Sequence, residues 1–485
     1  MPPSKERSSI KVESERAVLA AVRLPTDRYE FADPFGELAE LAKQAGAVVV
    51  GTLEQRRERP EAGTYMGKGK VEELKALCEE LKAQTIIFDH DLSPKQIASI
   101  EKITERKVLD RSELILDIFA SRATTHEAKL QVEIAQLEYT YPRLRAMWDH
   151  LERIVGSGGI GGVGTRGPGE QQLEIDRRLV QQRKNQLQAE LRVIQERKRR
   201  AVSQRNIENF TVGLVGYTNA GKSTLFNTLT TGGAYADDRL FATLMTRTRQ
   251  WDLGGGETVL LSDTVGFVRD LPHQLVASFR ATLEEATHAD LLLIVLDISD
   301  PAAEMQLETV NQTLDDLFDE VEEHERRQHR ALVRDGAGIA RVWQRPQRLV
   351  LLNKVDRLSD NRDMLVWQAK RPGSIAICAL DAQSDPRRIG HEELRQFVLE
   401  QVRGPMREVE VRVPMSLSRA VHTLESRGVV LERMYEDERV RLRVRIGARQ
   451  LSRVVAMGAG IEVLRDEAVA GQTDAQAAPA LDLPG

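Results

Sequence analysis

Short apolar runs alternate with amphipathic stretches over the first 110 residues. The runs lie at 17–24, 45–53, 83–90 and 107–110, and each has the length of a buried strand. Between them, stretches such as DPFGELAELAKQAG and GKVEELKALCEELKA carry apolar residues at helical spacing. Strands that alternate with helices are typical of a mainly parallel sheet covered by helices. We therefore predict an N-terminal α/β domain over residues 1–135.

A different pattern follows in residues 136–206. A long helical stretch that opens at SELILDIFA leads into GSGGIGGVGTRGPGE (156–170), whose glycine density excludes a helix or a regular strand. The chain is then polar and helical, and residues 177–205 hold ten Lys or Arg against two Glu. We predict a glycine-rich loop and a basic helix or helical hairpin, although a charge run of this kind is often only a solvated face.

A second alternation of strands and helices begins at FTVGLVG (210–216). Its predicted strands continue as TRQWDL, ETVLLSD, LLLIVLD, RLVLLN and SIAICA, which defines a domain over 207–403. A last α/β stretch over 407–466 runs through REVEVRVPM, SLSRAVHTLESRG, RVRLRVRIG and RQLSRVVAMG. The low-complexity tail at 467–485 is predicted to be disordered. The chain as a whole is predicted to be an α/β multidomain protein.

Composition narrows the class of protein. At 485 residues the chain is too long for one core, and with 41% hydrophobic and 29% charged residues it has an ordinary globular composition. Its two cysteines, Cys78 and Cys378, exclude a disulfide framework and suit a reducing cytosol. The N-terminus lacks an apolar signal core, and the aliphatic run at 291–296 is too short to span a bilayer. We expect a soluble, cytoplasmic, monomeric protein with no membrane span.

The segment from Gly216 to Ser223 matches the phosphate-binding pattern G-x-x-x-x-G-K-[ST]. It follows an apolar strand and precedes a helix, which is the context that the motif requires. Its backbone N–H groups can wrap phosphates, Lys222 adds a positive charge and the Ser223 hydroxyl can bind Mg²⁺. The predicted phosphate-binding residues are Gly216, Tyr217, Thr218, Asn219, Ala220, Gly221, Lys222 and Ser223.

The string N-K-V-D at 353–356 predicts which base is bound. The Asp356 carboxylate can accept hydrogen bonds from guanine N1–H and N2–H₂ together, whereas adenine has no such donor pair. Lys354 can lie across the base, and Asn353 can tie this loop to the phosphate-binding loop. Cys378, where a serine is usual, begins a segment whose backbone N–H groups can reach the guanine oxygen. The predicted guanine-binding residues are Asn353, Lys354, Val355, Asp356, Cys378, Ala379 and Leu380.

Two further segments are predicted to sense the γ-phosphate. The D-x-x-G element comprises Asp263, Thr264, Val265 and Gly266. Thr243 is the candidate that completes the Mg²⁺ shell, with Thr246 as the reserve and a merely structural threonine as the alternative. The candidate first switch segment is Phe241, Ala242, Thr243, Leu244 and Met245.

Phe267 stands where Ras-like enzymes carry the glutamine that orients the attacking water. A phenyl ring cannot do this, so we expect it to be a buried anchor. We hypothesise that Asn219 helps to bind K⁺, which would supply positive charge near the transferred phosphoryl group. The alternative is an asparagine that only bonds within its own loop. Lys222, Asn219 and Gly266 are the predicted catalytic residues.

Together these motifs resemble the HflX family of translational GTPases. The resemblance also rests on TYMGKGKVEEL (64–74), DRSELILDIFASRATTHEAKLQVEIAQLEY (110–139) and GTRGPGEQQLEIDRR (164–178). It implies a Ras-like P-loop G domain preceded by an α/β domain with a helical extension and followed by a small α/β domain. It also implies binding of GTP or GDP with Mg²⁺, association with the large ribosomal subunit and its RNA, and splitting of stalled or idle ribosomes.

This sequence departs from the family pattern in three further places. FATLMTRT has Met245 and Thr246 where the family carries Asp and Pro, and 314–347 resembles an insertion without an assigned role. The run GSGGIGGVG is longer and less basic than the segment that usually precedes TRGPGE in the family. The alternative functions are a ribosome-assembly GTPase and a GTP-gated RNA-binding module with little turnover. ATP use by the N-terminal domain is a further alternative, because G-K-G-K at 67–70 could contact phosphates.

Overall fold

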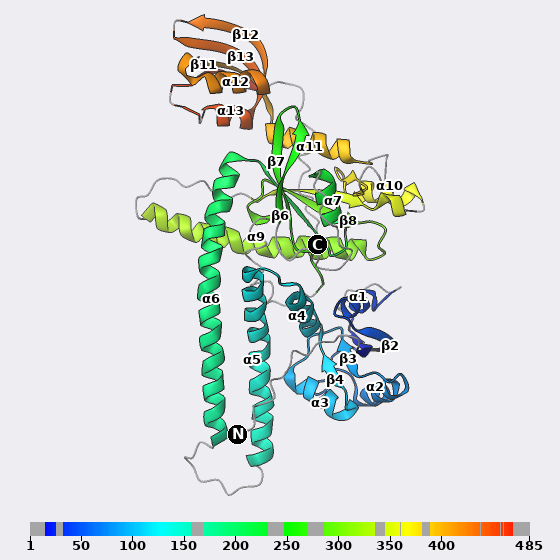
Figure 1. Cartoon of the computed structure of the whole chain (residues 1–485). Coiled ribbons are helices and arrows are strands. Elements are labelled where there is room, and N and C mark those ends of the chain that lie inside the picture. Colours follow the sequence, from blue (N-terminus) through cyan, green and yellow to red (C-terminus); the bar gives the residue numbers. More distant parts are fainter. Residues whose placement is uncertain are drawn as a thin grey trace, which may run out of the picture. The chain divides into compact units, whose positions relative to one another are not determined.

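The structure is a computed structural model, and Figure 1 presents the whole chain. It describes residues 15–25, 33–156, 168–230, 247–269, 286–334, 345–358, 360–380, 389–436, 438–455, 457–458 and 460–468. The chain divides into two compact units. The first comprises Met1–Gln250 and Leu260–Arg387, and the second comprises Trp251–Val259 and Arg388–Gly485.

The first unit begins with a parallel four-stranded sheet in the order β2-β1-β3-β4. The central strand β1 is buried on both faces: Ala17, Leu19 and Ala21 belong to one apolar cluster, and Val18 and Ala20 belong to another. The predicted N-terminal α/β sheet is therefore confirmed. Its elements are β1 Arg16–Arg23, α1 Gly36–Gln44, β2 Val48–Arg56, α2 Lys68–Glu80, β3 Thr85–Phe88, α3 Pro94–Thr104 and β4 Lys107–Leu109.

Three helices follow this sheet: α4 Arg111–Arg122, α5 His126–Gly156 and α6 Pro168–Glu208. Helices α5 and α6 lie side by side as a helical hairpin (Figure 1). Leu130 and Ile134 of α5 pack with Leu187 and Leu191 of α6 in one apolar cluster. Helix α5 runs through residue 135, so the predicted domain boundary there falls inside a helix.

A six-stranded sheet in the order β10-β9-β8-β5-β7-β6 carries the predicted G domain. Strands β5, β7, β8, β9 and β10 pair in parallel. The strand predicted over SIAICA is reduced to two residues. The elements are β5 Thr211–Gly216, α7 Lys222–Leu229, β6 Arg247–Gly254, β7 Glu257–Asp263, β8 Leu291–Asp297, α9 Ala303–Arg334, β9 Gln347–Asn353, α10 Asn361–Lys370 and β10 Ile375–Ala376.

The second unit contains an antiparallel sheet in the order β12-β13-β11-β14. Val409, Leu442 and Leu424 belong to its apolar core. The sequence pattern predicted β11 and β13 but not the two edge strands, because their side chains are mostly exposed. The elements are α11 His391–Arg403, β11 Met406–Pro414, α12 Ser418–Arg427, β12 Val429–Glu436, β13 Arg439–Gly447, α13 Ala448–Val455 and β14 Glu462–Ala468. Most of the predicted tail lies outside the described residues.

Candidate nucleotide site

The loop from Gly216 to Lys222 joins the buried strand β5 to helix α7. Gly216 and Gly221 have positive φ values of 150° and 98°. A Cβ atom would lie 2.3 Å from the Val295 carbonyl oxygen at Gly216, and 2.3 Å from Asn353 Nδ2 at Gly221. Both positions therefore require glycine. Asn219 is exposed and has a left-handed backbone with φ of 61°.

The Lys222 side chain lies over its own loop. Its Nζ donates hydrogen bonds to the carbonyl oxygens of Gly216, at 3.1 Å, and Tyr217, at 2.6 Å. Burial disfavours its charge and Lys354 repels it, while Asp263 attracts it. The net effect lowers the Lys222 pKa to about 8. An added anion such as a phosphate would stabilise this charge.

The D-x-x-G segment begins where β7 ends, beside the phosphate-binding loop. The Ser223 hydroxyl donates to Asp263 Oδ2 at 2.7 Å, and the Asp263 carboxylate is fully buried. A Cβ atom on Gly266 would lie 2.9 Å from Thr218 Cα and 3.0 Å from Lys222 Nζ, so this glycine allows a close approach. The predicted phosphate-loop and D-x-x-G residues are thus brought together.

Phe267 also lies against the phosphate-binding loop. Its N–H donates to the Gly216 carbonyl at 3.1 Å, and its carbonyl accepts from the Thr218 N–H at 2.8 Å. The ring is 4% exposed and belongs to the apolar cluster of the G-domain sheet, together with Tyr217 and Leu296. Phe267 is therefore a buried apolar side chain in this structure, as expected of an anchor.

The N-K-V-D segment follows β9 and meets both neighbouring loops. Asn353 Nδ2 donates to the Ala220 carbonyl at 2.7 Å, and Asn353 Oδ1 accepts from the Ala379 N–H at 3.0 Å. Lys354 is ion-paired with Asp297 at 2.6 Å. Asp356 is exposed and accepts a 3.3 Å hydrogen bond from the Cys378 thiol. A carboxylate accessible to solvent is thus placed beside the loop that carries Ala379.

The geometry joins a phosphate-binding loop to an N-K-x-D loop through Asn353. Three family models match the chain: "GTP-binding GTPase N-terminal" over residues 33–120, "GTP-binding GTPase Middle Region" over 122–205 and "50S ribosome-binding GTPase" over 211–333. A GTPase HflX of Escherichia coli is 38% identical over 89% of this chain and 93% of its own length. The chain belongs to the HflX family of GTPases.

Other HflX relatives give the same result. The GTPase HflX of Lacrimispora saccharolytica is 48% identical over 64% of this chain and 73% of its own length. A solved structure, "crystal structure of SsGBP and GDP complex", matches 80% of this chain and 98% of its own at 24% identity, with a TM-score of 0.41. A likeness with this TM-score supports no further conclusion about the chain. As an HflX protein, the chain is a P-loop GTPase that acts on GTP.

Two oxygen ligands of the kind that Mg²⁺ prefers lie together at this HflX site. They are the Ser223 hydroxyl and the Asp263 carboxylate. Among the described residues no group of three or more His, Cys, Asp or Glu could hold a metal ion.

Part of the HflX site prediction lies outside the described residues. This applies to Phe241, Ala242, Thr243, Leu244, Met245 and the reserve Thr246, and also to residues 157–167 of the glycine-rich loop predicted over 156–170. The ends of that predicted loop are helical instead, because Gly156 ends α5 and Pro168 begins α6. In the described part of the chain, no helix has the length and apolar character needed to cross a bilayer.

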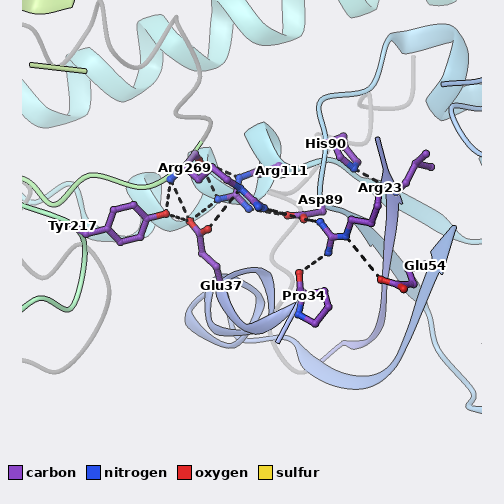
Figure 2. A network of polar contacts seen from close by, with 10 residues as sticks. Arg23, Pro34, Glu37, Glu54, Asp89, His90, Arg111, Tyr217 and Arg269 are labelled. Carbon is purple, nitrogen blue, oxygen red and sulfur yellow. Dashed lines mark hydrogen bonds and ion pairs between the residues drawn. The ribbon is translucent and has the colours of Figure 1, made fainter. Parts of the chain in front are cut away.

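Sequence reasoning missed several residues around the D-x-x-G segment. They lie in the N-terminal sheet region, which we define as β1 to α4. Its residues Glu37, Asp89 and Arg111 contact Tyr217 or Arg269, as Figure 2 shows. Asp89 directly follows the buried strand β3, and polar residues at that edge of a parallel sheet often contact ligands. That signal could have identified Asp89, although not its partner.

Proposed function

We propose that this HflX GTPase binds the large ribosomal subunit and splits stalled or idle ribosomes, with GTP hydrolysis releasing the factor. The observation that carries the proposal is the α5–α6 hairpin in the same chain as the nucleotide site. The family model described as "50S ribosome-binding GTPase" supports the partner. We expect the protein to act in the cytoplasm as a monomer.

The charges of the hairpin favour RNA as its ligand. Arg183 and Lys184 of α6 pair with Glu133 and Glu138 of α5, at 2.8 and 3.3 Å. The positive charge of α6 is thus partly neutralised within the hairpin. Further exposed arginines on α6 can meet RNA phosphates, and these are Arg178, Arg192 and Arg197.

Within the nucleotide site the residue roles follow their positions. The P-loop from Gly216 to Ser223 binds the phosphates, and Lys222 neutralises developing charge on them. Ser223 and Thr243 would hold Mg²⁺, which would neutralise negative charge on the phosphates. Gly266 would contact the γ-phosphate, and Asn219 would help to hold K⁺. Guanine is recognised by Asn353 to Asp356 and by Cys378 to Leu380.

We expect GTP affinity to fall as the pH rises above about 8, because binding would raise the lowered pKa of Lys222. Below pH 8 the lysine is charged with and without nucleotide, so the affinity is flat. Above pH 8 the free protein must take up a proton to bind, and each pH unit costs about tenfold until the bound-state pKa is passed. Titration with a fluorescent GTP analogue between pH 7 and 9 measures this slope.

A matched control for this titration is Lys222→Arg, which stays charged throughout the range. Its affinity is expected to be weaker but nearly flat with pH. If wild type and Lys222→Arg have the same slope, another group sets the pH dependence and the assignment to Lys222 is wrong.

Reversing two charges on α6, Arg192→Glu with Arg197→Glu, is expected to reduce ribosome splitting at least tenfold while GTP affinity stays the same. Each phosphate contact that is removed should lower the salt slope of large-subunit binding by about one. Sucrose-gradient separation of subunits and binding at several KCl concentrations provide the measurements.

The control is Arg326→Glu with Arg327→Glu, two arginines of α9 that are 70% and 73% exposed. This variant has the same change in net charge and should split ribosomes normally. Normal splitting by the α6 variant would contradict the role of the hairpin. Binding to immature large subunits but not to mature ones would favour the ribosome-assembly function.

A further inference from the structure

The D-x-x-G segment and the residues that follow it, up to Arg269, contact the N-terminal sheet region as well as their own domain. Val265 and Val268 are 7% and 2% exposed and belong to the apolar cluster that contains Leu19 of β1 and Leu38 of α1. Phe267, between them, packs in the G-domain cluster instead. Successive side chains of one short segment are therefore buried in two different apolar cores.

Arg269 adds a polar link to the same region (Figure 2). Its Nη2 donates to both carboxylate oxygens of Asp89 at 2.9 Å. Its carbonyl oxygen accepts from Arg111 Nε and Nη2 at 3.2 and 3.0 Å. Its N–H donates to the Tyr217 hydroxyl at 2.7 Å, and that hydroxyl donates to Glu37 at 2.7 Å. Both the side chain and the backbone of Arg269 are therefore fixed.

The partners of Arg269 are buried. The side chains of Asp89 and Arg111 are 0% and 1% exposed, and that of Arg269 is 14% exposed. Asp89 also pairs with Arg23 at 2.7 Å and with Arg111 at 2.8 Å. Burial opposes its charge, but the attraction of Arg111, Arg269 and Arg23 together keeps the pKa of the Asp89 carboxyl below its ordinary value. Asp89 is thus an anion that accepts a guanidinium.

Asp89 lies at the point of the sheet where open parallel sheets usually bind a ligand. Arg23 ends β1 and Asp89 follows β3, and these neighbouring strands flank the point where the connections of the sheet change direction. In open parallel sheets the crevice at this point is the usual place for a ligand. Here the side chain of Arg269 lies against its residues.

We propose that Asp89 and Arg111 are positioning residues of the GTPase, which hold Arg269 so that Gly266 stays beside Lys222, where the γ-phosphate must bind. This rests on the proposed nucleotide site. A segment that is fixed before binding loses less conformational freedom when the γ-phosphate arrives. Because GDP lacks that phosphate, the contact favours GTP over GDP.

The same contact makes the N-terminal sheet region responsive to nucleotide. If holding Arg269 favours GTP, then GTP must favour holding Arg269 by the same factor. The end of β3 should therefore be better protected in the GTP state. No contact between the nucleotide and the N-terminal sheet is needed for this response.

Arg269→Ala tests the proposal in the full-length protein. We expect the affinity for a non-hydrolysable GTP analogue to fall about tenfold, within the 5–150-fold range typical of coupled sites, with GDP affinity close to wild type. Arg57→Ala is the control, since Arg57 pairs with Glu61 at 3.2 Å in the N-terminal region and should leave both affinities unchanged. Thermal unfolding of each variant verifies that it is folded.

Asp89→Asn removes the other partner of the ion pair. The double variant with Arg269→Ala should lose no more GTP preference than either single variant, because both substitutions disrupt the same Asp89–Arg269 contact. Equal weakening of GTP and GDP, additive losses or a rise in GTP preference would each overturn the proposal. If the wild type bound neither nucleotide, the nucleotide site itself would be wrong.

Hydrogen exchange of the wild type tests the reciprocal effect without any substitution. The amides of residues 85–92 are expected to exchange more slowly with the GTP analogue than with GDP. A merely structural ion pair would give the same exchange in both states. Identical protection in both states, with both nucleotides bound, would also overturn the proposal.

Discussion

GTP turnover by the purified protein is expected to rise at least 10³-fold when large ribosomal subunits are added. Phosphoryl transfer depends on positioning and on charge stabilisation, and an added arginine or its equivalent is worth about 10³–10⁵ in rate, roughly 4–7 kcal/mol. Phe267 cannot orient a water, and its ring is buried in the G-domain core. Intrinsic turnover should therefore be slow, and the partner should complete the site.

The measurement is single-turnover hydrolysis with large subunits, with small subunits as the control, in KCl and in NaCl at equal ionic strength. Faster turnover in KCl would assign part of the missing glutamine's role to K⁺, and loss of that preference in Asn219→Ala would connect it to Asn219. GTP binding without turnover in any condition would contradict the prediction. It would favour the GTP-gated RNA-binding module instead.

Asp356→Asn is expected to weaken GTP binding by about 10²–10⁴-fold and to create binding of xanthosine triphosphate. In the proposed guanine site the carboxylate would accept two hydrogen bonds from the base, and a hydrogen bond to a charged group contributes about 1.5–3 kcal/mol. An asparagine amide instead directs N–H donors at the guanine donors. Xanthine carries an oxygen at that position, so the amide can donate to it.

Competition against a fluorescent GDP analogue measures the affinities for GTP and for xanthosine triphosphate in one experiment. Asp363→Asn is the matched control, because Asp363 lies exposed in the first turn of α10 and should have no effect. The Cys378 thiol donates to Asp356 at 3.3 Å, so an asparagine at position 356 also changes the contact with Cys378. Loss of GTP binding without a gain of xanthosine triphosphate binding would contradict the specific role of Asp356.

The arrangement of the candidate nucleotide site was largely predictable because its signals are local. Gly216 and Gly221 are required by the backbone of one short loop, while Asn353 ends one strand and Asp356 follows it closely. The family resemblance supplied the order of the domains along the chain, which the fold confirms. Sequence patterns of this kind depend on a few neighbouring residues, so they can be recognised without knowledge of tertiary contacts.

The contacts of Arg269 could not be predicted in the same way. Arg269 and Asp89 are 180 residues apart, and their pairing depends on which surfaces of two sheets meet. The same reason explains the hairpin, where glutamates of α5 neutralise part of the basic charge counted along α6. Strand β14 was missed because all its residues are exposed, and alternation of buried and exposed positions is then absent.

Helix α6 is connected almost directly to the phosphate-binding strand. It ends at Glu208 and β5 begins at Thr211, with the buried Phe210 between them. With 41 residues, α6 is about 60 Å long at 1.5 Å per residue. A tilt of about 5° around its Glu208 end moves the Pro168 end through an arc of roughly 5 Å. A small change in direction where α6 meets the strand before the P-loop would therefore become a displacement of several ångströms at the far end of the helix.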